Sequence, residues 1–542
     1  MCQNLTLKIH SKLDTDRPII DTLTYVNQHT DYNSIILEIQ NLSKTLNSTG
    51  YLDHKITDFK KSNDSLFEAY LTLNKNYSYI YIRYTDIHYQ LLKSLGIESN
   101  NKFITLPLQE TKQSLNALNL KLAEQGLPFT TLQLQNITIK NDSVHADLIS
   151  SKKTIQRHID HIIIKGYEKF PKKFIKQYAR LKTGDVFNME DIKKKTNTLN
   201  KLSFANLIRD TEVLFTKDST TLYIYVEKQK SNNFDGYLGF TTNDNTNKLE
   251  FSGYLNMLLQ NNLNYGESIK LLYRSDENNQ KTFNINLDAP YIFKSPIGAN
   301  VELNIFKKDS SFTTVNQSLK LYYQFKTEHT TYLGITSSQS NNLLKENLST
   351  VIDDYNSNFF QSKYNFTHTD EDNNLFPIKS YADVNLGFGD RTYQTTKENQ
   401  IQYNIDLSNI FYLNTKNSLY SRIAVSGLKS DTYLENELLR FGGINSIRGF
   451  EENSLVASLY GVFNLEYRLQ LSPTIFINSI TDFSYFENQM INQKEKLIAL
   501  GVGFAILTKA GLLKMNYANG KTENSPFNIS DSKVHLSITS YF

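Results

Sequence analysis

Strict alternation of apolar and polar residues recurs from about residue 234 to the end of the chain, and it constrains the fold more than any other feature. In one such segment Ile401, Tyr403, Ile405 and Leu407 alternate with polar residues. A period of two is typical of a β-strand with one apolar and one polar face. Breaks rich in Asn, Asp, Ser and Lys separate the segments, so we expect consecutive antiparallel strands without intervening helices.

Sixteen such strands are predicted, and an even set of long strands favours a closed barrel. They begin near residues 234, 248, 264, 281, 297, 316, 330, 358, 378, 400, 417, 455, 475, 496, 511 and 533. Their polar face carries Lys320, Lys326, Asp406 and Arg468, too much charge for a small dry interior. A barrel of about sixteen strands encloses water. Residues 231–542 are therefore predicted to form a 16-stranded antiparallel transmembrane β-barrel, with its apolar face toward lipid.

Composition agrees with a β-protein that has a wet interior. Only 39% of the 542 residues are hydrophobic, yet 12% are aromatic. The single cysteine, Cys2, excludes an intramolecular disulfide and a multi-cysteine metal site. His158 and His161 lack a carboxylate set and are interpreted as surface histidines. With no His-Glu-x-x-His, Gly-x-Ser-x-Gly or Cys-x-x-Cys motif, we expect no enzyme activity, no cofactor and no metal.

Residues 154–230 are predicted to form a small unit in the order β-α-α-β-β. A strand at 159–165 is followed by helices at 171–181 and 189–202, and then by a hairpin over 212–227. This segment holds 16 Lys and Arg against 9 Asp and Glu. Such an excess suits an anionic lipid surface or nucleic acid, or it is simply a solvated helix face.

Two earlier units fit the same plan more loosely, at residues 1–76 and 77–153. A spacing near 75 residues, repeated three times, indicates an array of similar α+β units. The alternative is one larger α+β domain before residue 154. Both interpretations place all the helices in the first part of the chain.

Three features together resemble one family. The third unit has the strand, glycine, helix, Lys-Thr-Gly-Asp turn and hairpin of a polypeptide-transport-associated (POTRA) domain. A Gly-rich stretch at residues 440–450 ends in Ile-Arg-Gly-Phe, like the sixth loop of the POTRA-barrel superfamily of outer-membrane proteins. The last strand alternates and stops at a terminal aromatic residue, Phe542. The resemblance covers almost the whole chain and is closest to the TamA-type members of this bacterial surface antigen family.

The resemblance implies that the 440–450 loop folds back into the barrel lumen. Its functional residues would be Arg448, Gly449 and Phe450, preceded by the glycine pair Gly442 and Gly443. A charge drawn into a narrow lumen needs a partner of opposite sign.

Asp482 and Glu466 are the expected partners of that arginine, because alternation places both on the polar face. The strand around Asp482 departs from the family pattern, since Ile480 and Ser484 replace a Phe and a Gly. The alternative for each acid is a lumen charge hydrated by water.

The resemblance also implies a function. We expect an outer-membrane protein assembly factor whose POTRA domains receive unfolded precursors by β-augmentation. The barrel seam would open sideways between strand 234–243 and the strand that ends at Phe542. Gly236 and Gly239 would weaken that seam, or they serve ordinary close packing. The alternatives are a two-partner-type secretion pore and a passive porin-like barrel.

Location and partners follow from the same comparison. The barrel is expected in the outer membrane of a Gram-negative bacterium, with the POTRA domains in the periplasm. The opening residues from Met1 to Leu7 lack a basic segment and an apolar core, so a signal peptide is expected to be absent or removed. Expected partners are unfolded outer-membrane precursors, membrane lipid and periplasmic or lipoprotein accessory subunits, without nucleic acid.

Overall fold

The chain divides into two compact units, which are described separately. The computed structural model describes residues 5–84, 92–93, 99–100, 103–140, 143–151, 155–243, 248–275, 280–344, 351–370, 373–508, 511–523 and 525–539. One unit comprises Met1–Ile163, Lys182–Lys194 and Thr211–Tyr223, and the other comprises Ile164–Leu181, Lys195–Asp210 and Ile224–Phe542.

The first repeat follows the β-α-α-β-β plan with one short strand, β2, added between the two helices. Its elements are β1 (Leu5–Ser11), α1 (Arg17–Ile20), β2 (Gln28–His29), α2 (Tyr32–Ser48), β3 (Lys55–Lys61) and β4 (Leu66–Thr72). The sheet order is β2-β1-β4-β3, with β1 parallel to β4. Helix α2 begins where the Asp31 carboxylate accepts the Ser34 N–H at 2.8 Å. Its buried face, from Ile35 to Leu46, covers the sheet.

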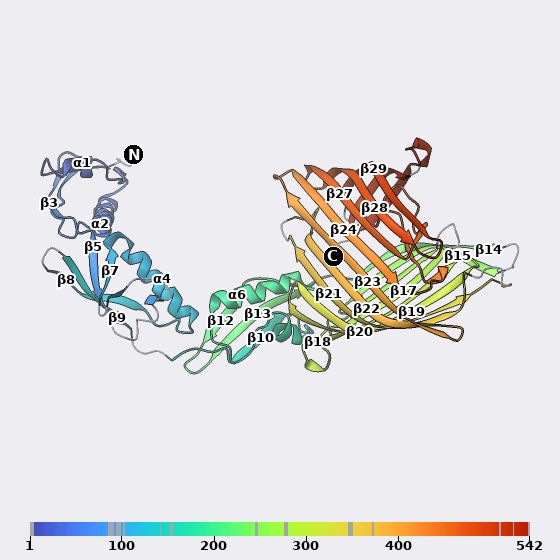
Figure 1. Ribbon diagram of the computed structural model, residues 1–542. Helices are drawn as coiled ribbons and strands as arrows, with labels where there is room; N and C mark the ends of the chain where they lie inside the picture. Colours follow the sequence, from blue (N-terminus) through green and yellow to red (C-terminus); the bar gives the residue numbers. More distant parts are fainter. Residues whose placement is uncertain are drawn as a thin grey trace. The chain divides into compact units, whose positions relative to one another are not determined.

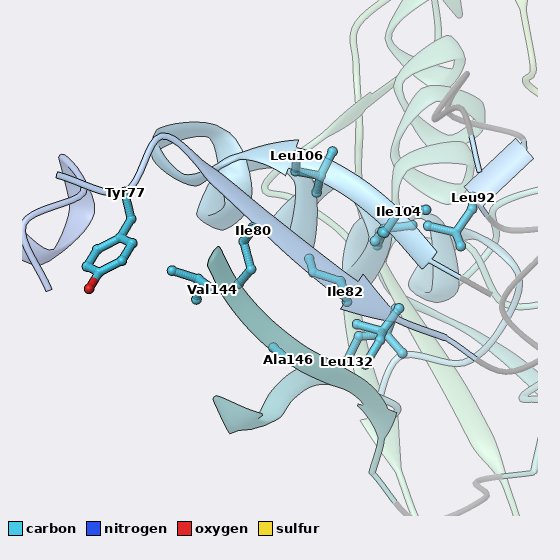
Figure 2. Close-up of a cluster of buried hydrophobic side chains, with 11 residues drawn as sticks. Tyr77, Ile80, Ile82, Leu92, Ile104, Leu106, Leu132, Val144 and Ala146 are labelled. Carbon is cyan, nitrogen blue, oxygen red and sulfur yellow. The ribbon is translucent and has the colours of Figure 1, made fainter. Parts of the chain in front are cut away.

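The second repeat is built around a five-stranded sheet, β6-β7-β5-β9-β8. Its described elements are β5 (Tyr79–Arg83), β6 (Ser99–Asn100), β7 (Phe103–Pro107), η1 (Leu108–Glu110), α4 (Thr111–Glu124), β8 (Leu132–Lys140) and β9 (Ser143–Ser150). Figure 2 shows its core, in which Ile80 and Ile82 of β5 lie beside Val144 and Ala146 of β9. The sequence pattern of this repeat predicts a helix around 87–96, and that segment lies almost entirely outside the described residues.

The third repeat contains β10 (His161–Gly166), α5 (Lys173–Gln177), α6 (Met189–Asn197), η2 (Thr198–Lys201), β11 (Ala205–Leu207), β12 (Glu212–Phe215) and β13 (Thr220–Lys228). Helix α5 is shorter than the predicted 171–181 because the chain leaves the helical region by Arg180, whose φ is +55°. The short strand β11 was not predicted, since three residues are too few to show a period. Its pairing with β13 identifies it as a strand.

No helix in the parts of the chain that the structure describes is both long and apolar enough to span a bilayer.

Sixteen antiparallel strands form the second unit's sheet, as predicted (Figure 1). They are β14 (Asn233–Asn243), β15 (Lys248–Gln260), β16 (Ser268–Ser275), β17 (Gln280–Ala289), β18 (Ile297–Lys308), β19 (Phe312–Lys326), β20 (His329–Asn342), β21 (Tyr355–Thr369), β22 (Ile378–Tyr393), β23 (Thr396–Tyr412), β24 (Asn417–Lys429), β27 (Leu459–Ser472), β28 (Ile475–Asn488), β29 (Gln493–Thr508), β30 (Gly511–Thr522) and β31 (Lys533–Thr539). Each strand pairs with the next along the chain, which is the order of an up-and-down barrel.

The exposure pattern is that of a barrel with an apolar outside. On β20, Leu333 and Ile335 are 56% and 60% exposed, whereas Ser338 and Ser340 on the other face are buried. On β28, Phe483 and Tyr485 are exposed and Asp482 is buried. Apolar residues outside and polar residues inside are the reverse of a water-soluble barrel. This is the arrangement of a strand wall that faces lipid.

Four barrel strands, β16, β19, β23 and β27, start four residues from the predicted position. The twelfth barrel strand was expected to begin near 455, but β27 begins at Leu459. Residues Leu455–Ala457 form β26, which pairs with β25 (Leu439–Phe441) as a separate hairpin. The apolar residues 455–457 lie directly before the wall strand, so the sequence pattern alone could not separate the two.

Candidate functional site in the barrel lumen

Residues 430–458, here called the lumen loop, connect β24 to β27 and pack against barrel-wall residues whose side chains face the lumen. The β25–β26 hairpin buries Phe441 in a cluster with Val462, Phe486 and Leu497 of the wall strands. Phe441 stacks on Tyr460 with their ring centroids 4.5 Å apart. Apolar packing therefore fixes the stem of the lumen loop on the inner wall.

The tip of the lumen loop is held by Arg448, Asp482 and Glu466, here called the tip clamp. The Arg448 Nε donates to Asp482 Oδ2 at 2.8 Å and its Nη2 donates to Asp482 Oδ1 at 2.6 Å. Its Nη1 donates to Glu466, and its backbone N–H donates to Asp482 at 3.1 Å. Asp482 is 0% exposed and Arg448 is 5% exposed. The planar guanidinium thus makes a bidentate contact with Asp482 and also bonds Glu466, in a fork geometry that an ammonium lacks.

Further wall groups complete the tip clamp. Arg468 donates to Glu466 Oε2 at 2.8 Å and lies over the Tyr420 ring, 4.1 Å from its centroid. Arg422 forms a two-pronged ion pair with Asp406, both contacts at 2.8 Å. Its Nη1 also donates to the Asn445 carbonyl at 2.6 Å. A polar cavity of about 400 Å³ adjoins these groups. Sequence reasoning placed Arg468 on the lumen face but did not assign it this role.

The backbone conformation and close contacts at the tip require glycine at several positions. Gly449 has a φ of +83°, and a Cβ there would overlap the backbone of Asn519 and Gly520 on β30. A Cβ at Gly520 would in turn overlap the Phe450 ring. Gly442 and Gly443, with φ of +108° and +95°, form the turn that leads to the tip. Gly520 was not predicted, because a lone glycine in a strand gives no signal of what approaches it.

The requirement for a residue without a side chain at position 449 can be tested. Gly449→Ala should loosen the tip by about 1–2 kcal/mol for the left-handed backbone and by about 1–3 kcal/mol for the overlap with β30. Trypsin cleavage after Arg440, inside the lumen loop, measures the loosening. Gly184→Ala is the matched control, since Gly184 has a φ of +90° and nothing within 4 Å. Equal cleavage of the two variants would refute the close approach at Gly449.

A second cluster, here called the wall clamp, holds the first limb of the lumen loop. Arg391 of β22, only 1% exposed, donates to Glu398 Oε2 at 2.7 Å and to Glu437. Its Nη2 also donates to the Thr432 hydroxyl at 2.7 Å. Glu437 lies in η4 (Glu435–Glu437) of the lumen loop and accepts the Gln400 amide at 3.0 Å. The sequence did not predict the wall clamp.

The predicted seam residues lie at the two ends of the sheet. Gly236 pairs with Leu255, and Gly239 pairs with Ser252. Phe542 lies outside the described residues. Over the described residues, no pairing joins β31 to β14.

No group of three or more His, Cys, Asp or Glu side chains in the described ranges could hold a metal ion.

A lipid-facing barrel preceded by small α/β repeats, with a loop clamped inside the lumen by a buried arginine, defines a class of outer-membrane β-barrel proteins. The Omp85 superfamily domain matches residues 255–538, which is more than half of the chain. The chain therefore belongs to the Omp85 superfamily and is a bacterial outer-membrane β-barrel. The surface antigen variable number repeat, a POTRA family, matches residues 158–229.

Solved structures share the fold at low sequence identity. BamA from Haemophilus ducreyi lacking POTRA domains 1–3 is 13% identical, with a TM-score of 0.52, over 84% of this chain and 97% of that chain. CdiB from Acinetobacter baumannii is 12% identical, with a TM-score of 0.51, over 81% and 85% of the two chains. CdiB from Escherichia coli is also 12% identical, with a TM-score of 0.51, over 93% and 96%. No curated protein matches the sequence.

Proposed function

We propose that the chain is an outer-membrane protein assembly factor. Its repeats lie in the periplasm at 1–76, 77–153 and 154–230 and receive unfolded precursors, which then enter the membrane through a seam between the first and last barrel strands. The observation that carries the proposal is the combination of a clamped lumen loop with a first and a last barrel strand that lie at the two ends of the sheet order. The loop restricts the lumen as a route for the precursor, while an end strand offers an edge for pairing.

The second repeat supports the receiving step. β8 is the edge strand of its sheet, and Ile137 and Ile139 on it are 59% and 43% exposed. An edge strand with unpaired backbone groups and exposed apolar side chains is a template for another strand. A precursor strand could add to β8 by β-augmentation. The bulge near Asn136, whose φ is +53°, limits how far such a strand can pair.

The seam supports the insertion step. β14 and β31 are the two ends of the 16-stranded sheet order, and over the described residues each pairs with one neighbouring strand. An end strand held by one ladder of backbone hydrogen bonds is easier to displace than an inner strand held by two. Gly236 and Gly239 lower the intrinsic stability of β14, the strand on the other side of the seam.

The second candidate is a two-partner-type secretion pore. It is favoured by the similarity to the two CdiB structures, whose TM-scores of 0.51 are close to that of BamA at 0.52. Against it stand three repeat-like units and a lumen loop that is clamped at two places. A passive porin-like barrel is opposed by the same clamps, because a steady open conductance needs a clear lumen.

Depletion of the protein separates these functions. An assembly factor should cause several outer-membrane barrels to decline together in a quantitative outer-membrane proteome. A secretion pore should cause the loss of one exported protein, with normal barrel levels. An unchanged proteome would leave the porin-like function. Re-expression of the wild-type gene is the control for each arm.

A further inference from the structure

A groove of about 880 Å³ lies where helix α5 meets two turns of the barrel wall, and it is here called the junction groove. Its lining includes Lys172, Lys173 and Lys176 from the α5 segment and Tyr265, Phe293 and Lys294 from the turns. None of these residues belongs to the lumen site.

The junction groove is a built feature, because α5 is tied to the turns. The Lys173 Nζ donates to the Pro290 carbonyl at 2.5 Å. The Phe174 ring packs edge-on against the Tyr291 ring, with the two ring centroids 5.1 Å apart. The Phe174 ring also lies so close to Gly266 that a Cβ at residue 266 would overlap it. The Gln177 amide donates to the Lys294 carbonyl at 3.3 Å.

The turn between β17 and β18 presents an aromatic ring outward. Phe293 is 95% exposed, and the backbone holds it there with positive φ at Tyr291, Phe293 and Lys294. Positive φ is unfavourable for residues with side chains, so some compensating contact is expected. Tyr265 and Leu263 in the neighbouring turn are each 65% exposed.

The position of these turns along the wall suggests their environment. Alternate turns of an up-and-down barrel lie at the same end, so the β15–β16 and β17–β18 turns are at the end where the chain passes from the third repeat into β14. The outer wall between the two ends faces lipid. Aromatic residues beside lysines at the end of such a wall are typical of the membrane–water interface.

The charge of the junction groove is positive. Lys172, Lys176 and Lys294 are exposed, whereas partial burial lowers the pKa of Lys173. The one acid of the lining, Glu267, accepts the N–H groups of Leu263 and Tyr265 at 2.6 and 3.0 Å. Its carboxylate is thus used by the turn itself, and Lys172, Lys176 and Lys294 remain exposed.

We propose that the junction groove binds an anionic phospholipid of the adjacent leaflet, with the lipid phosphate on Lys172, Lys176 and Lys294 and an acyl chain along Tyr265 and Phe293. The site is independent of which client the barrel handles, and it requires only that the barrel lies in a membrane. Binding would fix the third repeat at the lipid surface.

The absence of tryptophan from the sequence makes a direct experiment available. Phe293→Trp places the only indole of the full chain at the junction groove. The variant is reconstituted in phosphatidylcholine vesicles that contain equal amounts of brominated phosphatidylglycerol or brominated phosphatidylcholine. We expect the brominated anionic lipid to quench the fluorescence more strongly, with local enrichment of about fivefold, the order contributed by one lysine near an anionic surface.

Phe504→Trp is the matched control for lipid contact without the lysines. Phe504 is 36% exposed on the outer wall, and its cross-strand neighbours are Ile477 and Met515. Its quenching should be the same with both brominated lipids.

Charge variants in the Phe293→Trp background then test the headgroup contacts. Lys172→Gln, Lys176→Gln and Lys294→Gln together should equalise the two lipids, while Lys173 is kept because it supports the groove. The control variant replaces the exposed lysines Lys44, Lys55 and Lys60 of the first repeat and should keep the preference for the brominated anionic lipid.

Equal quenching by both lipids before any lysine is changed would overturn the anionic site. No quenching by either lipid would overturn the membrane contact, and that result would favour a soluble partner.

Discussion

Arg448→Ala is expected to release the tip of the lumen loop. The substitution leaves Asp482 buried without its cation and leaves Glu466 with Arg468 alone, and breaking a buried ion pair from one side costs about 3–5 kcal/mol. Movement of the tip away from the wall would hydrate Asp482 and relieve that cost. We therefore expect a larger and noisier conductance in planar bilayers than the wild type gives.

Trypsin provides the second readout for this variant. The Arg440 side chain is 12% exposed and lies in the lumen loop, so the wild type should resist cleavage there. Arg448→Ala should be cleaved readily. Arg448→Lys keeps the charge but lacks the planar fork, and it should fall between the two. Arg274→Ala, at an exposed position in β16, is the control. Wild-type conductance together with protection of Arg440 in Arg448→Ala would show that the tip clamp does not hold the loop.

Arg391→Ala is expected to release the first limb of the lumen loop while the tip stays in place. The guanidinium is nearly fully buried between Glu398 and Glu437, so its loss leaves two acids without their partner. The penalty is again about 3–5 kcal/mol for the local structure. Because the tip clamp remains, the increase in conductance should be smaller than for Arg448→Ala. Cleavage after Arg440 should still become faster.

A double-mutant cycle tests the contact itself. Arg391→Ala and Glu437→Gln should be non-additive, with a coupling energy of about 0.5–3 kcal/mol in unfolding measurements. The matched control is Lys397→Ala, which removes a cation that is 66% exposed and paired with Asp390 at 3.3 Å in the same hairpin. That substitution should change little, since exposed pairs contribute about 0–1 kcal/mol. Additive effects of the first two substitutions would show that Arg391 and Glu437 act independently.

The barrel could be predicted from sequence because the same physical constraint applies to every strand of its wall. Every strand must face lipid on one side and the lumen on the other, so period-two alternation marks each strand. β15, β18 and β22 begin at the predicted residues 248, 297 and 378. The rule failed at residue 455, where an apolar segment of the lumen loop lies directly before the wall strand.

The clamps were only partly predictable. Asp482 and Glu466 could be placed on the polar face by alternation, and the family resemblance suggested Arg448 as their partner. Arg391 gave no such signal, because its partner Glu437 is 46 residues away and many lumen residues carry charge. Which charges meet depends on the path of the lumen loop, and no local pattern specifies that path. The inserted strands β6 and β7 of the second repeat were missed because they contain only 2 and 5 residues.

Purified wild-type protein in lipid vesicles tests the assembly function most directly. An unfolded outer-membrane protein is added, and the protease-resistant, heat-modifiable fraction is followed in time. The proposed function predicts faster insertion than into empty vesicles and a loss of that acceleration with Arg448→Ala, while Arg274→Ala retains it. Insertion at the rate of empty vesicles with the wild-type protein would contradict the assembly function.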